Sequence, residues 1–187
     1  MKKYLPFLIL IFLVSLIAVS TYKINNKQVD AENLENQNSK EDSSPHFIKT
    51  KISLPDFSLP DLFKENEILS KKTFQKKYSL VNFFASWCTT CRAEHDILLR
   101  LKSEGIIDIY GIAFRDIDEN TKKFLDQHGN PYTQVAKDSK GLFSKIINLN
   151  AVPETLIIDQ NGDVVMRYRG NLQESSLDEI RKFLQLK

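Results

Sequence analysis

Uninterrupted apolar runs alternate with helical patterns of apolar and polar positions along the chain after residue 50. Residues 79–85 (SLVNFFA) and 107–114 (IDIYGIAF) are almost entirely apolar, as is typical of strands buried on both faces of a sheet. Between these runs, residues 91–103 carry apolar side chains at helical spacing, and Gly105 supplies a stop. The pattern predicts a strand, a helix and a second strand in succession.

Further predicted elements follow up to the C-terminus. Residues 118–128 indicate a helix, with Asp116 or Asp118 available as its N-cap and Gly129 as its stop. The later elements are a weak strand at 132–136, a short helix at 142–148, strands at 155–159 and 164–168, and a last helix that Ser175 or Ser176 caps and that ends near residue 186. Asn161-Gly162 between the last two strands predicts a hairpin. This order predicts an α/β fold, with a central mixed sheet flanked by helices.

The first 22 residues have a different character. Lys2 and Lys3 precede an apolar run at residues 5–19, and the stretch approaches the roughly 20 residues that a membrane-spanning helix needs. We therefore expect a signal anchor at residues 1–22, with the N-terminus in the cytoplasm. A cleaved signal peptide is a second interpretation, and a buried core helix is a third that the lack of a polar face disfavours.

Residues 23–50 are rich in Asn, Gln, Glu, Lys and Ser and have few large apolar side chains. Such a segment buries too little surface to offset the entropy of ordering it, so it predicts a flexible tether. The remaining residues, 51–187, are expected to form one folded domain on the far side of the membrane.

Composition narrows the classes of function. The chain of 187 residues has 26 Lys and Arg against 24 Asp and Glu, a net charge of +2, which argues against a nucleic-acid binder. With only two cysteines, a scaffold of several disulfides is excluded.

The two cysteines carry the candidate chemistry. Cys88 and Cys91 are separated by two residues at the point where the first apolar strand leads into a helix. At a helix N-terminus, free N–H groups and the macrodipole favour an anion, which lowers the pKa of a thiol there. We expect Cys88 to be the exposed nucleophile and Cys91, one turn further on, to be the resolving thiol.

Two other interpretations use the same residues. Cys88, Cys91 and His95 could supply three ligands to zinc, although no convincing fourth ligand is visible. A purely structural disulfide would close a very small loop and would constrain little of the unfolded chain.

The segment FFASWCTTCRAEH at residues 83–95 resembles the active site of thioredoxin-like proteins. More narrowly, the chain resembles the membrane-anchored thiol reductases of cytochrome c maturation, the CcmG/DsbE family. The blocks that carry this resemblance are PDFSLP at 55–60, GNPY at 129–132, NAVPETLIID at 150–159 and YRG at 168–170.

This resemblance implies a thioredoxin-like fold with a cis peptide bond between Val152 and Pro153, beside the cysteines. It also implies that Glu94 and Glu154 belong to the active-site environment, although each could be a solvated charge. Thioredoxins carry a buried Asp at the position of Asn82 as a proton acceptor. An amide cannot take that role, so Glu94 becomes the candidate substitute.

Three further residues complete the expected active-site environment. Thr89 and Thr90 stand between the cysteines, where the family usually has a proline, so the reduction potential stays open. Trp87 is expected to be a packing residue and a platform for the substrate rather than a catalyst.

The resemblance implies an extracytoplasmic thiol:disulfide oxidoreductase that reduces apocytochrome c before haem attachment. A membrane electron donor would regenerate its dithiol, and no cofactor is needed. Alternatives are a broader reductase or oxidase with other clients, and a non-catalytic module that binds apocytochrome c near Pro153.

Overall fold

The computed structural model describes residues 47–75 and 77–185, all of which belong to one unit that spans residues 45–187. The elements, in chain order, are β1 (Ile48–Ser53), β2 (Ser58–Pro60), β3 (Ile68–Ser70), the 3₁₀ helix η1 (Lys71–Phe74), β4 (Ser79–Phe84), α2 (Thr89–Glu104), β5 (Asp108–Phe114), α3 (Asp118–His128), β6 (Gln134–Asp138), α4 (Leu142–Ile146), β7 (Glu154–Ile158), β8 (Asp163–Arg169) and α5 (Glu174–Gln185).

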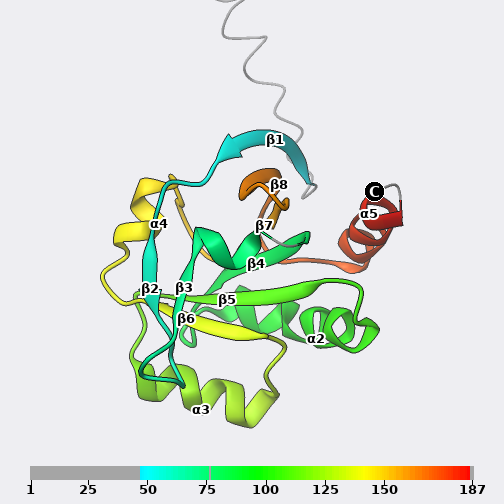
Figure 1. Ribbon diagram of the computed structural model, residues 1–187. Helices are drawn as coiled ribbons and strands as arrows, with labels where there is room; N and C mark the ends of the chain where they lie inside the picture. The colour runs from blue at the N-terminus through cyan, green and yellow to red at the C-terminus, as the bar shows by residue number, and fades with distance from the viewer. Residues whose placement is uncertain (1–46, 76, 186–187) are drawn as a thin grey trace, which may run out of the picture. The chain divides into compact units, whose positions relative to one another are not determined.

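A mixed sheet in the order β1-β8-β7-β4-β5-β6 forms the centre of this unit, with β1 at one edge and β6 at the other (Figure 1). β4, β5 and β6 run parallel, whereas β7, β8 and β1 join by antiparallel pairing. β2 and β3 form a separate hairpin, and the chain just after β2 bridges to β6 through Asp61 and Ala136.

Side chains alternate along the central strands and build one core layer on each face of the sheet. On one face, Leu80 and Phe84 of β4 belong to a cluster that includes apolar residues of α2, α3 and α5. On the other face, Val81 and Phe83 of β4 pack with residues of the β2–β3 hairpin, η1 and α4. All six side chains of β4 are buried, as its apolar sequence predicts.

The predicted central elements are confirmed with small shifts. The hairpin of β7 and β8 is present, and Gly162 in its turn has a φ of +79°, which glycine adopts without strain. The weak strand lies two residues later than expected, so Tyr132 precedes it.

The predicted N-caps of α3 and α5 were wrong, whereas Gly105 and Gly129 are the C-caps of α2 and α3, as predicted. The N-cap of α3 is Ile117, which makes no side-chain hydrogen bond to the helix. Asp116 lies one residue earlier, and its carboxylate accepts from the Ser86 amide and hydroxyl, at 2.6 and 2.9 Å. α5 already begins at Glu174, so Ser175 and Ser176 lie inside its first turn.

The structure also contains β1, β2 and β3, which the apolar pattern did not reveal. The expected anchor at residues 1–22 lies outside the described residues, as does the tether except for its last four residues. Within the described ranges, no helix has the length and apolar character that crossing a membrane requires.

Candidate active site

Cys88 and Cys91 lie where the chain turns from β4 into α2, and they form a disulfide with their Cα atoms 5.3 Å apart. Cys88 is the N-cap of α2, and its Sγ accepts a hydrogen bond from the backbone N–H of Cys91 at 3.1 Å. A sulfur held at this point faces the free N–H groups of the helix, which favour its thiolate form once the pair is reduced.

Cys88 is more buried than we expected. The exposed fraction of Cys88 is 5%, and that of Cys91 is 2%. The Val152 carbonyl oxygen and the Thr90 hydroxyl lie 3.6 and 3.3 Å from the Cys88 sulfur. Trp87, by contrast, is 57% exposed, and its indole N–H donates to the Arg115 carbonyl at 3.2 Å. The large exposed surface beside the disulfide therefore belongs to Trp87.

The peptide bond between Val152 and Pro153 is cis, as the family resemblance implied. The Val152 carbonyl oxygen lies 3.6 Å from the Cys88 sulfur, although the two residues are 64 positions apart in the chain. The Pro153 carbonyl accepts from the Gly170 N–H at 3.0 Å, which ties this loop to the end of β8.

Asn82 and Glu94 form the centre of a buried polar network beneath the disulfide-bearing turn. The Asn82 amide donates to the Glu94 Oε1 at 2.7 Å and to the Thr155 hydroxyl at 3.1 Å. Its carbonyl oxygen accepts from the Tyr132 hydroxyl at 2.8 Å, and the Glu94 Oε2 accepts from the Leu172 N–H at 2.7 Å. Each polar atom of this network has a partner, which a buried site requires.

Glu94 is fully buried, so the solvated-charge interpretation is wrong for this residue. Burial raises the pKa of Glu94 to about 7, although the hydrogen bonds from Leu172 and Asn82 partly oppose that rise. A carboxyl group in this range can both accept and release a proton near neutral pH.

Glu154, directly after the cis proline, is also buried, with 1% of its surface exposed. It forms an ion pair with Arg167, and the Arg169 guanidinium lies 3.9 Å away. Burial raises the pKa of Glu154, and Arg167 and Arg169 oppose that rise. The solvated-charge interpretation is therefore wrong here as well.

The contacts of the His95 side chain are with residues other than the two cysteines. Its Nε2 lies 2.9 Å from the Gly129 carbonyl oxygen, and its ring packs edge-on against Phe124. Within the described part of the chain, no three His, Cys, Asp or Glu side chains gather as metal ligands would. The ligand set considered for zinc is therefore not assembled.

The residues of this region that were not predicted from sequence include Tyr132, Arg167 and Leu172. The first two were visible within the GNPY block and beside the YRG block. The hydrogen bond of Tyr132 to Asn82, however, joins residues 50 positions apart, and those of Arg167 to Glu154 and Ile147 join residues 13 and 20 positions apart.

A family model described as Redoxin matches residues 49–182. The chain belongs to the Redoxin family. It is 38% identical over 122 residues to the thiol:disulfide interchange protein DsbE of Haemophilus influenzae, a match that covers 65% of this chain and 66% of that protein. It is 37% identical over 126 residues to the protein of the same name from Pasteurella multocida, covering 67% and 69%.

A crystal structure described as a putative DsbE from Chlorobium tepidum superposes with a TM-score of 0.63 at 21% identity, covering 74% of this chain and 96% of that one. This likeness shows the thioredoxin-like fold. Together with the relatives named DsbE, the Redoxin match identifies the chain as a thiol:disulfide oxidoreductase of the DsbE type. The disulfide between Cys88 and Cys91 is consistent with this activity.

Proposed function

We propose that this protein reduces disulfides of apocytochrome c on the extracytoplasmic side of the membrane, before haem attachment. The observation that carries the proposal is the position of the Cys88 sulfur, at the N-terminus of α2 and 3.6 Å from the carbonyl that precedes the cis proline. The choice of client rests on the resemblance to the reductases of cytochrome c maturation.

The reaction uses Cys88 as the nucleophile. Its thiolate attacks one sulfur of the client disulfide, so a mixed disulfide forms and the first client thiolate leaves and takes up a proton. Cys91 then attacks the Cys88 sulfur, forms the Cys88–Cys91 disulfide and releases the second client thiol. Two electrons have passed from the protein to its client.

The client would bind as an extended segment beside Val152 and Pro153. A proline has no N–H, so the strand-like edge at this loop can pair with a client backbone only through neighbouring groups such as the Val152 carbonyl. Trp87 offers an exposed aromatic surface next to the disulfide for client side chains.

Glu94 is the group we assign to the proton of Cys91. It follows Cys91 by three residues on α2, which places the two on neighbouring turns of one helix face. Asn82 cannot accept that proton, but it holds the Glu94 carboxyl group in place through its amide.

Residues 1–22 would anchor the protein in the cytoplasmic membrane as a single span, with the C-terminal domain on the periplasmic or other extracytoplasmic side. Residues 23–50 would then tether the domain near its clients and raise their effective concentration. A membrane protein that carries electrons would return the Cys88–Cys91 disulfide to the dithiol.

The test is a pair of substitutions, Cys88→Ser and Cys91→Ser, in the full chain. We expect Cys88→Ser to abolish reduction of a disulfide-bonded peptide that contains a haem-attachment CxxCH motif. Cys91→Ser should instead accumulate a mixed disulfide between Cys88 and the peptide, which non-reducing electrophoresis detects.

The same variants decide between a reductase and a binding module in cells. A module that only binds apocytochrome c would still support cytochrome c assembly after Cys88 and Cys91 are both replaced by Ser. If the double variant restores assembly as well as the unchanged protein does, the proposed function is wrong.

A further inference from the structure

The geometry points to Arg167 as a positioning residue that holds the loop beside the disulfide in its client-binding shape. We define the client-binding loop as residues 147–153, which connect the end of α4 to the start of β7. This inference rests on the proposed function, because the loop matters only if clients bind beside it.

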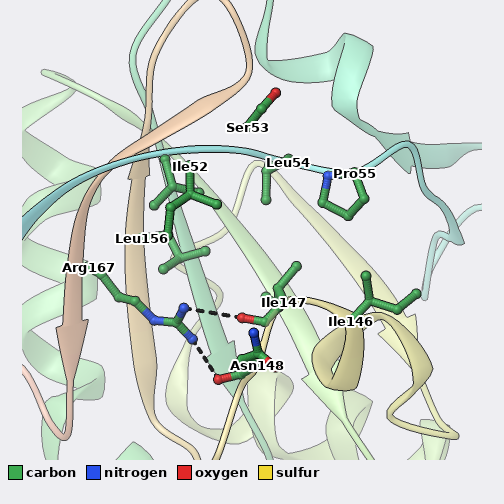
Figure 2. Close-up of a pocket in the computed structure, with 10 residues that line it drawn as sticks. Ile52, Ser53, Leu54, Pro55, Ile146, Ile147, Asn148, Leu156 and Arg167 are labelled. Carbon is green, nitrogen blue, oxygen red and sulfur yellow. Dashed lines mark hydrogen bonds between the residues drawn. The ribbon is translucent and has the colours of Figure 1, made fainter.

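Arg167 contacts both ends of the client-binding loop. From β8 its guanidinium reaches across to the start of the loop, where Nη1 donates to the Ile147 carbonyl at 3.1 Å and Nη2 to the Asn148 carbonyl at 3.0 Å (Figure 2). Its Nε donates to the carboxylate of Glu154, the residue directly after the loop. The Arg167 side chain therefore connects the start of the client-binding loop to the residue that follows its end.

The loop needs such a support because its start is not regular backbone. Asn148 has a φ of 55°, in the left-handed region that is uncommon for residues other than glycine, although asparagine adopts it more readily than most. The carbonyl groups of Ile147 and Asn148 lie beyond the last turn of α4, where helical hydrogen bonds are no longer available to them. Arg167 supplies charged donors to both.

Only a guanidinium can make these three contacts together. Its donors are arranged in a planar fork, whereas a lysine ammonium is a single point charge on a flexible stem. Arg169 is two residues further along β8 and is half exposed; its nitrogen lies 3.9 Å from Glu154, beyond hydrogen-bonding distance. Arg169 can therefore contribute positive charge near Glu154, but it does not supply the planar set of donors that Arg167 supplies to the loop.

The client-binding loop in turn borders the reactive sulfur. The Val152 carbonyl, 3.6 Å from the Cys88 sulfur, belongs to it. A shift of the loop would move the backbone edge that pairs with an extended client, but it would leave Cys88 at the N-terminus of α2. Arg167 should therefore govern reaction with polypeptide disulfides far more than reaction with small disulfides.

The experiment compares Arg167→Lys with the matched control Arg169→Lys in the full chain. A cavity of about 230 Å³ lined in part by Arg167 leaves room for the new side chain. The second-order rate of reduction is measured for two disulfides, a peptide with the CxxCH motif and oxidised glutathione. We expect Arg167→Lys to slow the peptide reaction by about tenfold or more, as for a displaced positioning contact, and the glutathione reaction by less than about twofold.

Arg169→Lys should change neither rate by more than about twofold, as for a surface substitution. Equal losses with the peptide and with glutathione in Arg167→Lys, or no loss with either, would overturn the proposal. If the unchanged protein fails to reduce the peptide, the proposed function fails. Hydrogen exchange of the backbone amides at 149–152 then still decides the role of Arg167, because only Arg167→Lys should speed their exchange.

A misfolded Arg167→Lys protein would not end the test. Glu154→Gln combined with Arg167→Gln leaves no unpaired buried charge and still lacks the fork to the two carbonyl groups. We expect the same selective loss with the peptide. If this variant also fails to fold, Arg167 supports the whole fold rather than the loop, and the proposal is wrong.

Discussion

Thr90 is the residue between the two cysteines whose side chain reaches the nucleophile. Its hydroxyl lies 3.3 Å from the Cys88 sulfur, so it can donate to the thiolate once the disulfide is reduced. A hydroxyl group at this position should stabilise the Cys88 thiolate and so increase the fraction of Cys88 that is deprotonated near neutral pH.

Thr90→Val tests that contact, because valine keeps the shape and removes the donor. Loss of a hydrogen bond of about 0.5–1.5 kcal/mol should slow alkylation of reduced Cys88 at neutral pH by roughly 2- to 10-fold. Thr89→Val, an exposed substitution in the same turn, is the matched control and should react like the unchanged protein. Equal rates for all three proteins would show that the contact has no influence on the thiolate.

Glu94 should make the stability of the protein depend on pH. Its pKa is about 7 in the folded protein against an ordinary value of 4.5, so between these values the folded state holds a proton that the unfolded chain has lost. The free energy of unfolding therefore falls as the pH rises through this window. At about 1.4 kcal/mol for each unit of pKa, the full effect is on the order of 3 kcal/mol.

Chemical denaturation of the unchanged protein and of Glu94→Gln, at about pH 5 and about pH 8, measures this effect. Other titrating groups are common to both proteins, so their contributions cancel in the comparison. The unchanged protein should lose more stability between the two pH values than Glu94→Gln does. If both lose the same amount, the pKa of Glu94 is not raised in the folded protein, and its carboxylate is too weak a base to take up the proton of Cys91 near neutral pH.

For individual residues, the sequence was informative about functional groups that lie close together along the chain. The spacing of Cys88 and Cys91 placed them together at the start of one helix, and the family resemblance added Glu94 on the same helix. The burial of Glu94 could not be predicted, because it depends on Leu172, which lies 78 residues away. The family resemblance, and not the hydrophobic pattern, led to the cis bond before Pro153.

Among the elements, β1 shows why some strands escape a search for apolar patterns. Five of its six residues are exposed and the sixth is half-buried, since it pairs only with β8 at the edge of the sheet. β2 and β3 have three residues each, too few for a recognisable alternation. β4 and β5 were predicted correctly because burial on both faces demands uninterrupted apolar residues.

The residues that flank β1 should hold this strand in place. Phe47 is 6% exposed, and its ring lies 5.0 Å from that of Tyr168. Phe47→Ala should lower the free energy of unfolding by about 3–5 kcal/mol, as for other buried phenylalanines. Its neighbour Ile48 is 42% exposed, so Ile48→Ala should change stability by less than about 1 kcal/mol.

Urea unfolding of both variants measures these differences. Similar losses for Phe47→Ala and Ile48→Ala would mean that β1 is held by its backbone pairing with β8 rather than by the packing of Phe47 on Tyr168.

On the scale of the whole molecule, the sheet brings together segments that are far apart in sequence. β4 ends shortly before the cysteines, β7 begins directly after the cis proline, and the two strands are antiparallel neighbours in the sheet. This pairing is what places the Val152 carbonyl beside Cys88. Sequence alone predicted a mixed sheet and the β7–β8 hairpin, but it did not predict the neighbours of β4.

The reduction potential of the Cys88–Cys91 pair tests the central claim most directly. The protein is equilibrated with glutathione buffers, and the fluorescence of Trp87, the single tryptophan of the chain, reports the state of the adjacent disulfide. A reductase should show a potential of about −200 mV or lower. A value near the roughly −120 mV of the oxidant DsbA would contradict the account and would make disulfide donation the function of this protein.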